Sequence, residues 1–191
     1  MIITALTAPI DGVCKSAVQV IAGDRHPHHD GEMQPSELPY LPLDSDTPPN
    51  PCNSYALSKR LGEMMLEYFT RNFEIDTIAV RFPWLAGRRW MHHIRHANSY
   101  YDEGFSYLSC EDAAELIAAM LRAKLPGHRI YFPAACTPSS ELPIPTIIDR
   151  FFKGVPLRKP VEQLTSLVDI SRIEKETGWS PKDNLTNAAA A

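Results

Sequence analysis

A tyrosine and a lysine, Tyr55 and Lys59, stand four residues apart at the beginning of a segment with helical periodicity. On a helix this spacing places both side chains on one face, about one turn apart. A free tyrosine has a pKa of about 10 and is a poor base at neutral pH, but a neighbouring ammonium group favours its phenolate. The pair could therefore exchange a proton with a hydroxyl compound, while the lysine hydrogen-bonds a sugar hydroxyl. The alternative is an ordinary surface pair, because Tyr-x-x-x-Lys is a short motif.

Two histidine clusters suggest a different chemistry, at residues 26–30 (HPHHD) and 92–96 (HHIRH). His92 and His96 are four residues apart, so they could share a metal ion on one helical face. However, no glutamate lies between them as in His-Glu-x-x-His, and Arg95 opposes a cation. A solvated or substrate-facing loop is therefore the favoured interpretation, with no metal bound. A His-dependent metalloprotein ranks last among the functions considered.

The helix that carries Tyr55 is expected over residues 54–72, because its apolar side chains form one stripe. The stripe consists of Leu57, Leu61, Met64, Met65, Tyr68 and Phe69. Taken from the residues alone, such a stripe indicates packing in the core of the protein.

The remaining elements follow from short apolar runs and from capping residues. Strands are expected at residues 17–22, 77–82, 105–108 and 130–132, and helices at residues 110–124, 145–152 and 171–177. Residues Ser109–Asp112 resemble a capping box at the start of a helix. The start of the helix therefore explains Asp112 at least as well as ligand binding does. Residues 1–15 have a poor pattern that could be the remnant of a helix, residues 23–53 form a long loop, and residues 187–191 should fray. The alternation of strands and helices predicts an α/β fold with a parallel sheet.

Several motifs in the same order resemble the extended short-chain dehydrogenase/reductase family, the NAD(P)-dependent epimerases and dehydratases. The resemblance spans about residues 35–185. It rests on the proline-rich approach to SYALSK (54–59), RFPWLAG (81–87), FSYLSCEDAA (105–114), LVDIS (167–171) and GWSP (178–181).

This resemblance implies roles for individual residues. Tyr55 corresponds to the general acid/base, and Lys59 to the residue that keeps Tyr55 acidic and holds the nicotinamide ribose of NAD or NADP. Phe82 and Pro83 correspond to residues that border the nicotinamide. Arg81 matches a recurrent arginine, although it could equally pair with a carboxylate for structural reasons.

The sequence departs from the family pattern at two places. The family begins with a glycine-rich G-x-x-G-x-x-G turn that binds the pyrophosphate, but the nine glycines here are scattered. Only 54 residues precede Tyr55, so the chain resembles the C-terminal part of such an enzyme, a truncated member. The family also has a serine or threonine at the end of the strand before the loop, where this chain has Asp24. Ser36 is a further candidate replacement.

The fold expected from the resemblance is a partial Rossmann-like parallel sheet with helices, plus a small C-terminal substrate-side α/β region. Residues 1–124 would form the truncated Rossmann-like core, and residues 125–191 the C-terminal region, interleaved with residues 88–104. The net charge of −4 and the pI of about 6.0 give no reason to expect a nucleic-acid partner. Four widely spaced cysteines, no apolar run of membrane-spanning length and no signal-peptide pattern indicate a cytoplasmic protein with no membrane partner.

Two functions remain open. The first is an NAD(P)-dependent oxidoreductase of the epimerase/dehydratase type that acts on a nucleotide sugar or similar hydroxy compound. The second is a catalytically inactive, truncated family member with a structural or interaction role. Self-association is expected in either case, because the family builds dimers on a face similar to the apolar stripe. In addition, an open sheet edge at Val18–Ile21 would invite pairing with another chain.

Overall fold

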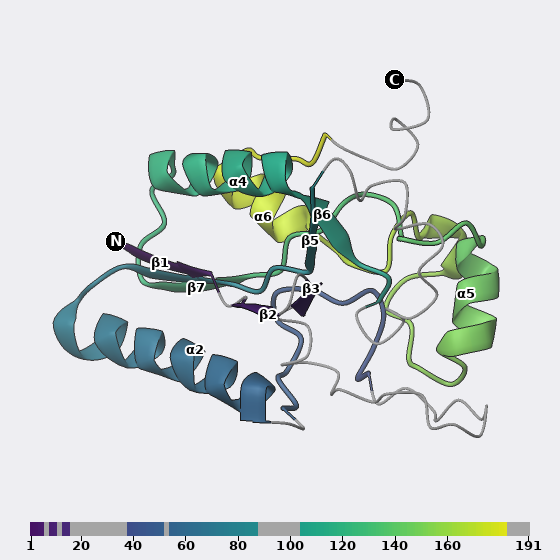
Figure 1. Cartoon of the computed structure of the whole chain (residues 1–191), viewed down its shortest axis with the longest axis horizontal. Coiled ribbons are helices and arrows are strands. Elements are labelled where there is room, and N and C mark those ends of the chain that lie inside the picture. Colours follow the sequence, from purple (N-terminus) through teal and green to yellow (C-terminus); the bar gives the residue numbers. More distant parts are fainter. Residues whose placement is uncertain (6–7, 11–12, 16–37, 52–53, 88–103, 183–191) are drawn as a thin grey trace.

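Three short parallel strands form the central sheet of the protein (Figure 1). They are β1 (Ile2–Ala5), β4 (Thr77–Val80) and β7 (His128–Tyr131), in the order β1-β4-β7. The structure is a computed structural model and describes residues 1–5, 8–10, 13–15, 38–51, 54–87 and 104–182. The predicted α/β fold with a parallel sheet is confirmed.

Two further strand pairs and five helical segments complete the described part of the chain. The antiparallel pair is β2 (Ala8–Ile10) with β3 (Val13–Lys15), and the second parallel pair is β5 (Trp84–Ala86) with β6 (Tyr107–Ser109). The helices are α2 (Ser54–Phe73), α4 (Cys110–Arg122), α5 (Ile144–Phe151), the 3-10 turn η3 (Val161–Gln163) and α6 (Ser171–Thr177). None of these helices is both long and apolar enough to span a bilayer.

Helices α2 and α4 cover opposite faces of the central sheet, as Figure 1 shows. Successive side chains of a strand point to opposite faces. Ile78 and Val80 of β4 accordingly pack with α4, whereas Ala79 between them packs with Leu66 of α2. A second core lies in the C-terminal region, where Phe132 and residues of α5 pack with Leu41 and other apolar side chains.

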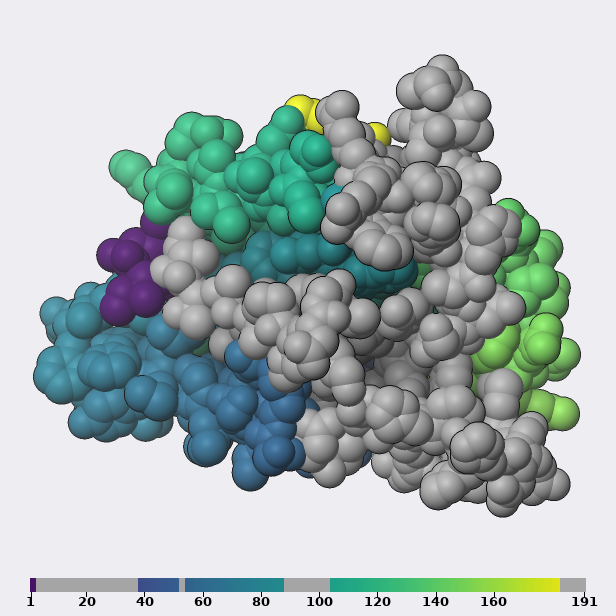
Figure 2. All heavy atoms as spheres, in the orientation of Figure 1, coloured from purple at the N-terminus to yellow at the C-terminus, as the bar shows by residue number. Residues whose placement is uncertain are grey.

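The expectation that the apolar stripe of α2 packs in the core is wrong. The side chains of the α2 apolar face are 36–59% exposed: Leu57, Leu61, Met64, Met65, Tyr68, Phe69 and Phe73. The helix instead buries a narrower line made of Ala56, Glu63 and Leu66. The buried line is narrow because a three-stranded sheet of four-residue strands offers little surface on which a helix of 20 residues can pack. In Figure 2 the side chains of α2 form the blue lower left of the surface.

The N-terminal residues also differ from the expectation. The poor pattern of residues 1–15 could be the remnant of a helix, but their described parts are the strands β1, β2 and β3. The β-branched Ile2 and Ile3 favour an extended chain, and β1 gains a ladder with β4 from Ile2–Thr77 to Ala5–Val80. The predicted strand at residues 17–22, with the open edge at Val18–Ile21, lies outside the described residues. Within the described part of the chain, the strand beside β4 on this side is β1.

Most of the other predicted elements are confirmed, with small shifts in their bounds. Helix α6 has the predicted bounds, and it ends at Gly178, whose φ of 68° is the left-handed conformation that closes many helices. The predicted strand at residues 105–108 begins two residues later, as β6, because Phe105 itself has a φ of 52°. Strand β5 was not predicted, since three residues are too few to show a strand periodicity.

A hydrogen-bonded cluster joins α2 to the beginning of the sheet. The hydroxyl of Thr77 lies 2.8 Å from Nδ1 of His128 on the neighbouring strand and 2.7 Å from the hydroxyl of Thr70 in α2. Thr70 in turn donates to the carbonyl of Ile75, at 2.8 Å. Burial lowers the pKa of His128 below its ordinary value, although Glu67 and Glu63 act in the opposite direction.

The lowered pKa of His128 makes folding depend on pH. The unfolded chain binds a proton at His128 near an ordinary pKa of about 6.5, before the folded chain does. Stability from this residue is therefore complete above pH of about 6.5 and is lost as the pH falls through the lower folded pKa. We expect the free energy of unfolding to fall between pH 7.5 and pH 5.5, and to fall less in His128→Gln. Urea denaturation at the two pH values measures this, and parallel losses in both proteins would contradict it.

Candidate functional site

The N-terminal end of α2 lies at the carboxyl edge of the central sheet. Only residues 74–76 separate the end of α2 from the beginning of β4, so the helix runs back along the strand. Its first residues therefore lie at the end where β4 terminates, and β1 and β7 point the same way. In open α/β sheets, ligands bind outside the carboxyl ends of the strands.

Tyr55 and Lys59 meet at this end of α2. The ammonium nitrogen of Lys59 lies 5.0 Å from the centroid of the Tyr55 ring, within cation–π range. Both side chains are half-buried, so a ligand can reach them. The arrangement offers a proton donor or acceptor next to a cationic hydrogen-bond donor.

A buried ion pair fixes α2 against the strand that leads to the site. Arg81 follows β4 directly, and its Nε and Nη2 donate to the two carboxylate oxygens of Glu63, at 2.6 and 2.9 Å. The remaining Nη1 donates to the carbonyl of Thr47, at 2.9 Å. Arg81 and Glu63 are 1% and 0% exposed. The structural explanation of Arg81, a pairing with a carboxylate, is therefore confirmed.

The segment before α2 is attached to the C-terminal region. Leu41 and Leu43 form isolated parallel bridges with Leu157 and Val168. The guanidinium of Arg158 lies 3.3 Å from the centroid of the Tyr40 ring, and its Nη1 donates to Asp44 at 2.5 Å. Thus the chain enters α2 from a segment held on the C-terminal core.

Phe82 and Pro83 are both buried. Phe82 is 2% exposed and packs with residues such as Leu116 and Trp179 in the core beneath α4. Its side chain is thus part of the core, and only its backbone can take part in ligand binding without repacking. The predicted role of both residues beside a nicotinamide stays a prediction.

Asp112 has a structural role at the beginning of α4. The hydroxyl of Ser109 accepts a hydrogen bond from the backbone N–H of Asp112 at 2.9 Å, as the capping pattern predicts. The Asp112 carboxylate is buried and accepts a hydrogen bond from the backbone N–H of Lys182, also at 2.9 Å. It therefore connects α4 to the segment that follows α6.

Several other predicted residues lie outside the described residues. These are Asp24 and Ser36, the candidates for the missing serine or threonine, and both histidine clusters. Within the ranges that the structure describes, no group of three or more His, Cys, Asp or Glu side chains is arranged to hold a metal ion.

Glu63 is the important residue that the sequence analysis missed. It lies eight residues after Tyr55, or about 12 Å along the helix. A signal was present, because Ala56, Glu63 and Leu66 are spaced by seven and three residues and so share one helical face. The more apolar stripe on the other side of α2 obscured this face.

These features define a parallel α/β protein with a Tyr-x-x-x-Lys helix at the carboxyl edge of its sheet. The sequence model of the NAD dependent epimerase/dehydratase family matches residues 31–131, just over half of the chain. The chain belongs to this family. No curated protein matches it significantly.

The chain shares its fold with several solved structures. A UDP-galactose 4-epimerase is 20% identical, with a TM-score of 0.51, and the match covers 81% of this chain and 58% of that protein. A UDP-glucuronic acid 4-epimerase from Bacillus cereus in complex with NAD is 18% identical, with a TM-score of 0.51 and coverage of 75% and 51%. RMD from Pseudomonas aeruginosa complexed with NADPH is 16% identical, with a TM-score of 0.51 and coverage of 78% and 57%. The chain thus spans little more than half the length of these proteins.

The ion pair of Arg81 with Glu63 yields a testable prediction for stability. In Glu63→Gln the buried guanidinium of Arg81 loses its opposite charge, and we expect the free energy of unfolding to fall by about 3–5 kcal/mol. The control is Arg60→Gln, which removes a partly exposed partner of Glu63, at 3.1 Å, and should lower it by less than about 1 kcal/mol. Urea denaturation measures both, and equal losses would contradict the prediction. A Glu63→Gln protein that is already unfolded by circular dichroism would agree with it.

Proposed function

We propose that this chain provides the acid/base and ribose-binding side of an NAD(P)-dependent epimerase or dehydratase site for a nucleotide sugar or similar hydroxy compound. In this proposal Tyr55 exchanges a proton with a substrate hydroxyl. Lys59 stabilises the Tyr55 phenolate and hydrogen-bonds the nicotinamide ribose. The observation that carries the proposal is the 5.0 Å approach of the Lys59 ammonium to the Tyr55 ring at the carboxyl edge of the sheet.

The residues present suit one part of the cofactor. The half-buried ammonium of Lys59 and the hydroxyl of Tyr55 are both donors that can bond ribose hydroxyls, so the two residues fit the nicotinamide ribose. When bound, NAD or NADP supplies the hydride chemistry, and the protein supplies position and electrostatics. Phe82 and Pro83 would border the nicotinamide through their backbone. The sequence has no glycine-rich turn for the pyrophosphate, so we expect the isolated chain to bind either cofactor weakly and to turn over substrate slowly or not at all.

A second candidate function is a structural or interaction role for a catalytically inactive family member. The α2 apolar face favours it, because seven large apolar side chains exposed on one helix form a patch that usually marks an interface. We propose a second copy of this chain as its partner. This role is compatible with the first, since α2 also carries Tyr55 and Lys59.

The proposed division into residues 1–124 and 125–191 stays a prediction.

The acid/base role of Tyr55 is tested by turnover of UDP-sugars with NAD or NADP. We expect the activity to be low, and Tyr55→Phe to reduce it by a further 10²–10⁴-fold, roughly the contribution of a positioned acid or base. The control is Tyr68→Phe, an exposed tyrosine on the same helix, which should keep the activity. Turnover that survives Tyr55→Phe would contradict the proposed mechanism.

Cofactor binding separates the two candidate functions. We expect calorimetric titration with NADH and NADPH to give weak binding that Lys59→Met reduces, because the ribose loses its cationic donor. Lys175→Met, on the exposed surface of α6, is the control. No heat with either cofactor, in protein shown to be folded, would favour the interaction role over catalysis.

The α2 apolar face predicts a dimer. We expect light scattering at micromolar concentration to give twice the mass of one chain. The double substitution Leu61→Glu and Met64→Glu should give a monomer, because two carboxylates cannot be buried unpaired in the interface. Leu121→Glu introduces a carboxylate on the exposed surface of α4 and should leave the dimer intact. A monomeric wild-type chain would contradict this prediction.

A further inference from the structure

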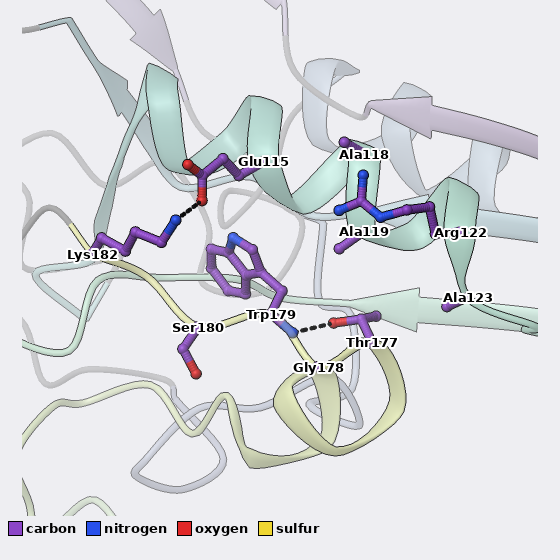
Figure 3. A pocket seen from close by; sticks show the side chains of 10 residues that line it. All are labelled: Glu115, Ala118, Ala119, Arg122, Ala123, Thr177, Gly178, Trp179, Ser180 and Lys182. Atoms are coloured by element: carbon purple, nitrogen blue, oxygen red, sulfur yellow. Dashed lines mark hydrogen bonds and ion pairs between the residues drawn. The ribbon is translucent and has the colours of Figure 1, made fainter.

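A groove lies between α4 and the turn that follows α6, and the proposed function does not use it (Figure 3). Its volume is about 590 Å³, which falls in the range of small-molecule sites. Ala118, Ala119 and Ala123 line the α4 side, and Trp179 lies opposite. Since α4 and α2 cover opposite faces of the sheet, this groove is distinct from the site at Tyr55.

The groove is more positive than negative. Lys182 and Glu115 form an ion pair at one end, with 2.6 Å between Nζ and Oε2, so their charges compensate. Arg122 lines the other end, and among the residues that the structure describes it has no ion-pair or hydrogen-bond partner. Figure 3 shows its guanidinium reaching back along α4 toward Ala118. The groove therefore holds one cation that is not neutralised by a described side chain.

Trp179 contributes a second unused donor. The side chain is 4% exposed, and its Nε1 is buried without a hydrogen-bond partner among the described residues. Figure 3 shows the indole nitrogen turned toward α4. A buried donor without a partner is unfavourable, and an acceptor brought in by a ligand would remove this penalty after a small rotation of the indole. The hydroxyls of Thr177 and Ser180 already donate to Ile173 and Glu174, so they do not compete as donors.

We propose that this groove binds a small organic anion, a carboxylate or phosphate carried on a flat ring. The guanidinium of Arg122 holds the anionic group, because a planar fork of donors suits both carboxylate and phosphate. The indole N–H of Trp179, which lies on the side of Glu115 and Lys182, donates to a substituent of the ring. The alanine side chains leave room for the ring on α4.

The test uses phenyl phosphate and benzoate as probes, with benzyl alcohol as the neutral analogue and ligand-observed NMR as the measurement. We expect at least one anion to bind with a millimolar dissociation constant, and the neutral analogue to bind about tenfold more weakly. The tighter of the two anions identifies the preferred anionic group.

Two arginine variants locate the binding. Arg122→Gln should weaken binding of the anion by about tenfold. Arg71→Gln is the matched control, because Arg71 is likewise exposed in the last turn of a helix, but lies on α2. Trp179→Phe keeps a ring and removes the N–H, and it should weaken binding by a few-fold. Thermal melts show that each variant is folded.

Two results would overturn the proposal. One is the absence of binding by both anions up to about 50 mM. The other is an equal loss of binding in Arg71→Gln and Arg122→Gln, which would show that the anions follow surface charge and not the groove. The role of Tyr55 is tested by turnover, so neither result affects the proposed function. The two proposals can therefore be rejected independently.

Discussion

The buried contact of Arg81 with Glu63 and the carbonyl of Thr47 is the interaction on which the arrangement of this protein depends. It joins three parts of the chain that are far apart in sequence: the segment before α2, the helix itself and the end of β4. Each of the three guanidinium nitrogens donates a hydrogen bond, so the charge is both paired and hydrogen-bonded, as a buried charge requires. Every residue in the first two turns of α2 then has a defined position relative to the carboxyl edge of the sheet.

This contact also explains how a helix with so little apolar burial remains in place. On the sheet side of α2, Ala56 and Leu66 provide only a small apolar contact, and the buried position between them in sequence is Glu63. The hydroxyl cluster of Thr70 and Thr77 holds the other end of the helix. The attachment is therefore largely polar, which leaves the more apolar side of α2 exposed. A helix attached in this way can present its apolar side to another chain without losing its own position.

The sequence predicted the local features well, because each depends on residues close together in the chain. The i, i+4 spacing of Tyr55 and Lys59 determines their common face, and the Ser109 cap determines where α4 begins. The features that failed depend on contacts distant in sequence. The exposure of the apolar stripe could not be predicted, since periodicity shows that a face is apolar but not whether a neighbour covers it. Glu63 was missed for a related reason, because its partner Arg81 is 18 residues away.

The two chemical tasks of the family make different demands on structure. The proposed proton transfer needs a tyrosine, a nearby cation and a fixed helix end, and the structure has Tyr55, Lys59 and the Arg81–Glu63 ion pair on or against α2. Hydride transfer needs a dinucleotide held at both ends, because one cationic contact to a ribose supports little more than millimolar affinity. This sequence has no G-x-x-G-x-x-G turn of the kind that binds a pyrophosphate. If Tyr55 acts as proposed, its proton exchange takes place beside a cofactor that is held at both ends, and the exposed side of α2 is a surface on which another chain can be brought close to it.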